Sequence, residues 1–250
     1  APREVNFWFG VVLLSLAMAL GLTGYLLPWD QKGYWATKVA TNLVAEFPFV
    51  GSAIQKILIG GTDYGHQTLT RFFAIHAGIL PGLMIAFIAG HVYLFRRHGI
   101  TPKKPLKGED EDFWPEQILK DAVACLAVLA AILYFVILHH GAALSAPADP
   151  SDQFSAARPE WYYIFLFQLL KYTSPFWGAI VIPGVLMVVI CLMPFFGKWK
   201  LGHRFNIGLL FSLLAGAVLL HWLAINEDDS SEHHQHAVAD AQEKSARAIV

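Results

Sequence analysis

Five long apolar stretches constrain this chain more than any other feature of its sequence. They lie at residues 7–27, 72–95, 119–138, 176–195 and 205–225, and each carries few charged side chains. A helix needs about 20 apolar residues to cross the roughly 30 Å hydrocarbon core of a bilayer. With 56% hydrophobic and 15% charged residues, the chain is too apolar for an ordinary soluble domain. The sequence therefore predicts an all-α membrane protein with five transmembrane helices.

Basic residues gather on one side of these five spans. An odd number of spans puts the two termini on opposite sides, and the basic residues cluster before the first span and in the loops after the second and fourth spans. They are Arg3, Arg96, Arg97, Lys103, Lys104, Lys107, Lys120, Lys198, Lys200 and Arg204. The positive-inside rule assigns this inner side to the cytoplasm. The loops 28–71 and 139–175 and the C-terminal tail then face the outer side.

The chain divides into three parts by composition and span order. Residues 1–100 hold the first two spans and the loop 28–71, whose amphipathic pieces predict short helices at the outer interface. Residues 101–226 hold the other three spans and the sequence PEWY. Residues 227–250 form a polar tail, which we expect to be mobile.

Two histidines, His76 and His91, lie inside the second span. Fifteen helical residues turn about 60° past four full turns and rise about 22 Å, so both imidazoles lie on roughly one face, near opposite sides of the bilayer. Pro81 lies between them and can kink the helix. Polar groups in hydrocarbon are costly and usually functional. Either histidine alone could bond a neighbouring helix, whereas two at this spacing suit the axial ligation of two stacked haems.

Two glycines of the first span, Gly10 and Gly24, have nearly the same separation as the histidines. A glycine in a helix lets another surface approach closely. The pair therefore fits two notches for the edges of two macrocycles. Ordinary packing of membrane helices through small residues is the alternative interpretation.

The motifs GYLLPWDQKGYW, LTRFFAIH and PEWY appear together in this order. With these residues the chain, from about Arg3 to Ile225, resembles the cytochrome b of the quinol:cytochrome c and plastoquinol:plastocyanin reductases. The resemblance implies that the five spans are the third to seventh helices of that family, part of its haem-binding helical bundle. The first two helices of the family have no counterpart here. We expect them on another polypeptide or on another part of a longer chain.

The resemblance implies two b-type haems. His76 would ligate the iron of the low-potential haem near the outer side, and His91 that of the high-potential haem near the inner side. Gly10 and Gly24 match the family's haem-contact glycines, and the unmatched helices would supply the second histidine of each haem. Asp30 and the histidine spacing resemble the chloroplast type, whereas the unsplit chain and Asp121 resemble the bacterial one. Both together imply a bacterial inner membrane protein with its tail in the periplasm.

The resemblance also implies oxidation of quinol at the outer side, coupled to proton translocation. One electron would pass to a Rieske iron–sulfur subunit and on to a c-type cytochrome or similar acceptor. The other would pass through the haems to a quinone at the inner side. Glu160, aided by Tyr162, would take the proton, because a carboxylate in a partly apolar pocket can act as a base near neutral pH. The alternative for Glu160 is a carboxylate favoured by a helix N-terminus. The pocket walls would be Tyr25, Trp35, Ala36, Pro159 and Trp161.

At the inner side, Asp121 would donate a proton to reduced quinone, and Arg96 would pair with a haem propionate or a quinone oxygen. Arg96 also fits simple positive-inside anchoring. His98 is interpreted as a surface or quinone-site residue. The lipid bilayer and a dimeric complex complete the expected partners, and no nucleic acid is expected. Two other functions stay open: a di-haem anchor of another quinone-linked oxidoreductase, and a cofactor-free helical scaffold.

Overall fold

The computed structural model describes residues 3–99, 113–141, 144–152 and 159–247, with side chains up to residue 227. The helices are α1 (Glu4–Tyr25), α2 (Gln31–Ala45), α3 (Gly51–Ile59), α4 (His66–Ala74), α5 (Leu80–His98), α6 (Ile118–Leu138), α7 (Trp161–Tyr172), α8 (Ile182–Phe196) and α9 (Gly202–Arg247). Three π-helical segments, Ile75–Ile79, Phe113–Gln117 and Phe176–Val181, lead into α5, α6 and α8. Within these described ranges the one β-bridge joins Asp30 to Pro147. The predicted all-α class is confirmed.

Five helical spans are long and apolar enough to cross a membrane. They are Glu4–Tyr25, His66–His98, Phe113–Leu138, Phe176–Phe196 and Gly202–Glu227. Each contains one of the apolar stretches of the sequence apart from a residue or two at the ends, so the five predicted spans are confirmed. The second span begins earlier than its apolar stretch, because the hydroxyl of Thr68 accepts a hydrogen bond from the backbone N–H of Gly65 and caps α4 there.

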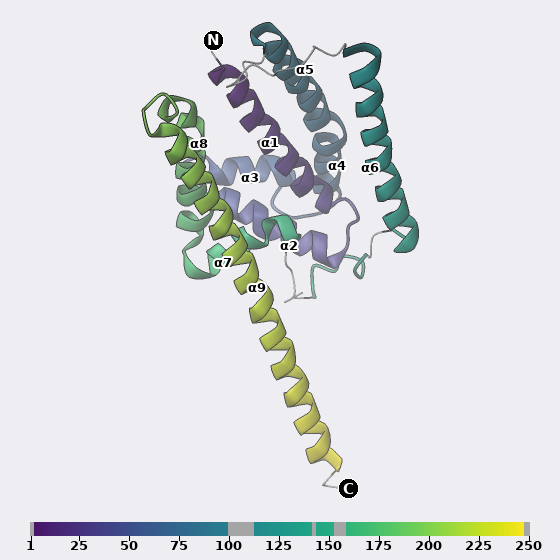
Figure 1. Cartoon of the computed structure of the whole chain (residues 1–250). Coiled ribbons are helices and arrows are strands. Elements are labelled where there is room, and N and C mark those ends of the chain that lie inside the picture. The colour runs from purple at the N-terminus through teal and green to yellow at the C-terminus, as the bar shows by residue number, and fades with distance from the viewer. Residues whose placement is uncertain (1–2, 100–112, 142–143, 153–158, 248–250) are drawn as a thin grey trace.

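The core of the bundle is the packing of α1 against α5, with α8 on another side of α1 and α7 against α9 (Figure 1). The indole N–H of Trp8 donates to the carbonyl of Cys191 at 2.8 Å and joins α1 to α8. The hydroxyl of Tyr163 donates to the carbonyl of Met18 at 2.6 Å and joins α7 to α1. These contacts hold α1 at the centre, where it faces both the predicted histidines and the PEWY motif.

The loop 28–71 folds into α2 and α3, as predicted, and the start of α4. Asp30 caps α2, because its Oδ1 accepts from the backbone N–H of Gly33 at 2.8 Å. Its Oδ2 accepts from the N–H of Ser145 at 3.0 Å, and the N–H of Gln31 donates to the carbonyl of Ala146 at 2.8 Å. We call these contacts between residues 29–33 and 145–148 the outer clasp. The clasp ties the start of α2 to the chain that follows α6.

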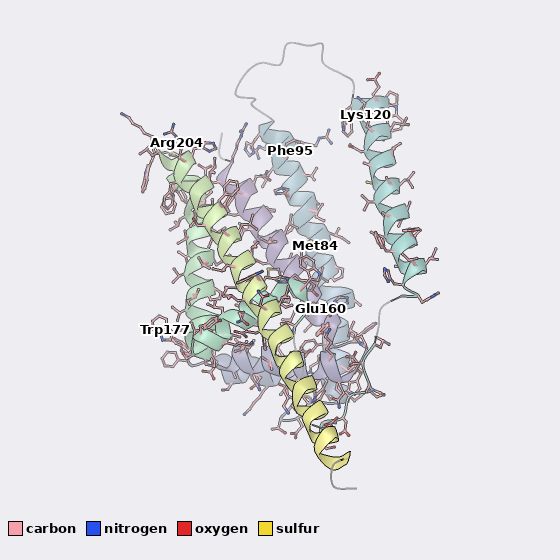
Figure 2. The ribbon with its side chains drawn as sticks, turned by 60° about the horizontal axis from the view of Figure 1, so that its bottom comes forward. Met84, Phe95, Lys120, Glu160, Trp177 and Arg204 are labelled. Atoms are coloured by element: carbon pink, nitrogen blue, oxygen red, sulfur yellow. The ribbon has the colours of Figure 1, made fainter. Side chains whose placement is uncertain are left out.

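Charged residues mark one end of the bundle. Figure 2 shows Phe95, Lys120 and Arg204 at one end, and Glu160 and Trp177 toward the opposite end. An ion pair of 2.7 Å joins Lys198 to Glu4. The basic residues that the sequence assigned to the inner side therefore do gather at one end, while their cytoplasmic orientation stays a prediction. Residues Lys103, Lys104 and Lys107 and the predicted boundary after residue 100 lie outside the described residues.

Two helices extend away from the bundle. Figure 1 shows α6 standing apart and the end of α9 reaching well beyond the other helices. Among the described elements, α6 contacts only the segment Phe113–Gln117 that precedes it. The backbone of α9 continues as a helix to Arg247, through most of the predicted polar tail. The mobility of that tail stays a prediction.

Candidate functional site

His76 lies within the π-helical segment Ile75–Ile79 and faces α1. The i→i+5 bonding of this segment underwinds the helix and reduces the offset of about 60° that a regular α-helix would leave between the two histidines. The Nδ1 of His76 lies 3.1 Å from the hydroxyl of Thr23. That hydroxyl donates its proton to the carbonyl of Ala19 at 2.8 Å. Its oxygen therefore accepts from Nδ1–H, which leaves the Nε2 lone pair of His76 available as a ligand.

His91 also faces α1. It lies fifteen residues after His76, nearer the inner end of the bundle. Its Nδ1 is buried and has no hydrogen-bond partner among the described residues. A buried polar atom without a partner is costly, so it calls for an explanation. A methyl group on Gly10 would lie 3.6 Å from the Cε1 of His91, which is an ordinary contact.

The two glycines of α1 lie opposite the two histidines, at different distances. A methyl group on Gly24 would lie 2.6 Å from the Cε1 of His76, closer than side chains approach one another. The imidazole rings thus occupy the level of both glycines, where the sequence predicted notches for macrocycle edges. This arrangement fits haem, because imidazole is a donor that haem iron accepts. Both imidazoles are half-buried. The Nδ1 of His76 is oriented by Thr23, and the Nδ1 of His91 has no partner among the described residues.

A second feature is a cavity of about 130 Å³ at the outer end, between α1, α2 and α7. Its walls are mostly aliphatic and aromatic. They are Gly21, Leu22, Tyr25, Ala36, Val39, Leu43, Pro159, Glu160, Tyr162, Tyr163, Leu166, Phe167 and Leu170. Among the described residues, the polar side-chain groups of this lining are the carboxylate of Glu160 and three phenol hydroxyls. A cavity of this kind suits a flat apolar ligand that carries a few polar atoms.

Glu160 is the N-cap residue of α7 in extended conformation, and its side chain makes no capping hydrogen bond. The alternative in which the helix dipole favours this carboxylate stays a prediction. The Oε1 of Glu160 lies 3.4 Å from the Nζ of Lys32 on α2. Tyr25 also interacts with Glu160. Burial, with the nearby charge of Glu160, raises the pKa of Tyr162 above its usual value, so this phenol stays protonated at neutral pH.

The structure brings five of the predicted quinol-site residues together around this cavity. They are Tyr25, Ala36, Pro159, Glu160 and Tyr162. Two others do not line it. Trp35 turns away, and its indole N–H donates to the Oε1 of Gln31 at 3.0 Å. The side chain of Trp161 is 69% exposed.

Sequence reasoning missed Lys32, Thr23, Gly21 and Tyr163. Lys32 could have been found, because a residue four positions before Ala36 lies on the same face of a helix. Thr23 carried no signal, since a threonine in an apolar helix commonly bonds its own backbone.

The structure does not bring Arg96 and Asp121, the predicted residues of the inner site, together around one cavity. A cavity of about 180 Å³ at the inner end is lined by Arg3, Asn6, Leu94, Phe95, His98 and Gly99. Arg96 is exposed and lies outside this lining. Asp121 is exposed on α6, where its Oδ1 accepts from the amide of Gln117 at 2.8 Å. The separation of α6 from the bundle keeps Asp121 away from Arg96, so their shared role stays a prediction.

Comparisons with known proteins agree with this arrangement. The family model "Cytochrome b(N-terminal)/b6/petB" matches residues 1–150, and "Cytochrome b(C-terminal)/b6/petD" matches residues 147–238. The chain is 34% identical over 231 residues to a cytochrome bc complex cytochrome b subunit of Chlorobaculum thiosulfatiphilum, covering 88% of this chain and 53% of the relative. It is 45% identical over 100 residues to cytochrome b6 of Cyanidium caldarium, covering 40% of this chain and 46% of the relative.

A solved structure titled "Hyperthermophilic respiratory Complex III" superimposes with a TM-score of 0.73 and 25% identity, covering 90% of this chain and 63% of that one. The chain spans about half the length of these curated relatives. Together with the five membrane-length helices, these matches show that the chain is a multi-pass membrane protein that belongs to the cytochrome b/b6 family.

Proposed function

We propose that this chain forms the part of a cytochrome b that oxidises quinol at the outer side of a bacterial inner membrane. The observation that carries this proposal is the outer cavity, in which the carboxylate of Glu160 stands among apolar walls and phenol hydroxyls. A quinol has the matching shape, a flat apolar ring with two hydroxyl groups. Membership of the family implies b-type haem, and we propose two haems.

The residues that would hold these haems are His76, through Nε2, and His91. Thr23 orients the imidazole of His76 through Nδ1. Gly24 and Gly10 leave room for the imidazole rings of His76 and His91 against α1. When bound, the haems supply one-electron acceptors in series across the membrane. The second axial histidine of each haem would come from a segment with the family's first two helices, on this polypeptide or another.

The outer cavity would handle the protons of the reaction. Oxidation of one quinol to quinone releases two electrons and two protons. A quinol hydroxyl would give its proton to the carboxylate of Glu160 in the cavity lining. Tyr25 and Tyr162 would hold the quinol oxygens by hydrogen bonds. The apolar walls, with Leu166 and Phe167 among them, would keep water from competing for these protons.

The two electrons released by each quinol would pass to two different acceptors, and these would be the partners of this chain. One electron from each quinol would go to a Rieske iron–sulfur subunit and then to a c-type cytochrome or a similar acceptor. The other would cross the membrane to a quinone at the inner side, which couples the reaction to proton translocation. Near the inner cavity, Arg3 and His98 join the predicted Arg96 and Asp121 as candidates for that quinone site. The complex would be dimeric.

The test is the Glu160→Gln variant of the native complex, measured by quinol:cytochrome c reduction and by haem content in a pyridine haemochrome assay. We expect two b haems per chain in both proteins and a loss of turnover of roughly 100-fold or more in the variant. The matched control is Glu46→Gln, at the exposed C-terminal end of α2. Absence of b haem from the native complex would overturn the haem proposal. Full turnover in Glu160→Gln would overturn the assignment of the outer cavity.

A further inference from the structure

Lys32 reaches the mouth of the outer cavity from α2 and pairs with Glu160. The two residues are 128 positions apart in the sequence, and Nζ lies 3.4 Å from Oε1. Their side chains are 43% and 38% exposed, so water reaches both groups. An ion pair this open contributes little to stability. Its position on the one carboxylate of the cavity lining therefore points to an effect on the chemistry of that carboxylate.

The backbone that carries Lys32 is held firmly. Its own N–H donates to the hydroxyl of Ser145 at 3.0 Å, and its two neighbours, Gln31 and Gly33, take part in the outer clasp. The side chain of Gln31 also donates to Asp152 at 3.4 Å. The clasp thus fixes the backbone of Lys32 against residues 145–148. Because this backbone is fixed, less conformational entropy is lost when the ammonium group is held beside Glu160.

Among the described residues, the other ionisable groups near Glu160 are not cations. Tyr25 and Tyr162 are phenols, which carry no positive charge. Asp30, on the clasp, uses its carboxylate to accept hydrogen bonds from Ser145 and Gly33. The acidic Asp152 faces Gln31. Lys32 is the basic side chain that the structure pairs with the carboxylate of the cavity.

We propose that Lys32 is a positioning residue that holds Glu160 at the cavity mouth as a charged carboxylate, ready to accept a proton from quinol. This inference rests on the proposed function of the outer cavity. In the step, the quinol O–H bond breaks and an O–H bond forms on Glu160. Neutralisation of the carboxylate ends its attraction to the ammonium group, and the pair opens. The proton then passes to water at the exposed mouth, while Lys32 stays an ammonium ion and the pair re-forms.

The pH dependence of quinol oxidation tests this role. Without the cation, Glu160 ionises less readily, so the acidic limb of the pH profile of kcat/KM should move to higher pH. In Lys32→Met we expect a shift of roughly half a pH unit, which lowers turnover about threefold on that limb and leaves the alkaline plateau unchanged. Lys32→Arg should restore the parent profile. The matched control is Lys56→Met, which removes the same charge from the exposed face of α3 and should not shift the limb.

A second readout does not depend on turnover. The infrared band of the protonated carboxyl group, identified by its loss in Glu160→Gln, can be titrated in the resting complex. The band should appear at higher pH in Lys32→Met than in the parent and in Lys32→Arg. The haem content of each variant reports that the complex has assembled, and Lys32→Gln replaces Lys32→Met if that variant does not assemble.

The pH profile of kcat/KM and the carboxyl infrared band together distinguish failure of the role of Lys32 from failure of the proposed function of the outer cavity. A carboxyl band that titrates identically in Lys32→Met and in the parent overturns the proposal, whatever the turnover. A shifted band with an unshifted pH profile of kcat/KM overturns the part of the proposal that concerns the reaction. A shifted band together with full turnover in Glu160→Gln shows that the ion pair is real, and that the proposed function of the cavity has failed instead.

Discussion

The hydroxyl oxygen of Thr23 accepts a hydrogen bond from the Nδ1 of His76 across a gap of 3.1 Å between two helices. The same hydroxyl gives its own proton to the carbonyl of Ala19, one turn back on α1. One threonine thereby sets both the orientation of the imidazole and the nitrogen that carries its proton. For a metal-binding histidine, such a partner raises the basicity of the ligand nitrogen.

Replacing Thr23 by valine keeps the size of the side chain and removes this hydrogen bond. We expect the haem held by His76 to bind roughly 10- to 100-fold more weakly, and its midpoint potential to change while that of the other haem stays the same. Redox titration of the b-haem absorption measures both effects. Thr23→Ser, which keeps the hydroxyl, is the control, and equal behaviour of the valine and serine variants would contradict the role of Thr23.

The two glycines of α1 should respond differently to the same substitution. In Gly24→Ala the new methyl group would lie 2.6 Å from the ring of His76, so the imidazole must move. In Gly10→Ala the methyl group would lie at an ordinary 3.6 Å from His91. We expect an altered spectrum for the haem at His76 in the first variant and unchanged spectra in the second. Alanine favours a helix by about 1 kcal/mol over glycine, so damage in Gly24→Ala cannot come from helix propensity.

Gly21 supports the outer cavity through its lack of a side chain. A methyl group here would lie 3.2 Å from the Cε2 of Tyr162 and would push that ring toward the cavity. We expect Gly21→Ala to raise the KM for quinol roughly tenfold, as a misplaced methyl group in a pocket does. Gly216→Ala, at a position on α9 with open space around it, is the control. An unchanged KM in Gly21→Ala would show that quinol does not use this wall.

The outer clasp should make stability depend on pH through Asp30. Burial raises the pKa of Asp30, but hydrogen bonds from Ser145 and Gly33 outweigh it and hold the pKa below its usual value. A carboxyl with a lowered pKa in the folded state stabilises that state above its unfolded pKa of about 3.9, and the stabilisation disappears as pH falls below it. Asp30→Ala should therefore cost about 1–2 kcal/mol at pH 7.

Thermal unfolding followed by tryptophan fluorescence measures this cost. The difference in Tm between the parent and Asp30→Ala should be constant from pH 8 to about pH 5 and should shrink below about pH 4. Asp63→Ala, in the exposed turn between α3 and α4, provides the control. A difference that stays the same from pH 7 down to about pH 2 would exclude the charge of Asp30 as the source of the stability.

The parts of the fold that follow local rules were predictable from the sequence. Apolar length alone predicted the five spans, and amphipathic stretches predicted α2 and α3. Helical periodicity placed His76 and His91 on one face, but it could not predict the π-helical segment at His76 that improves their alignment. Hydrophobic periodicity does not encode such a local change of backbone hydrogen bonding.

Contacts between distant parts of the chain were not predictable in the same way. The PEWY motif identified Glu160, but its pairing with Lys32 joins residues 128 positions apart, and no local pattern in the sequence encodes that contact. The resemblance to the family placed Trp35 in the pocket wall, whereas aromatic residues at an interface were the other interpretation. The hydrogen bond of Trp35 to Gln31 turns it aside. Asp121 and Arg96 were both expected at the inner quinone site, but α6 stands apart from α5.

The outer clasp has a consequence for the continuity of the polypeptide. It ties residues 29–33 to residues 145–148, and Tyr163 and Trp8 add two further joints between the N-terminal and C-terminal parts. A backbone break between Gly99 and Phe113 would leave all of these joints intact. Two separately translated pieces, divided between these residues, would therefore keep every contact that joins them. The same architecture can accordingly be encoded in one reading frame or in two.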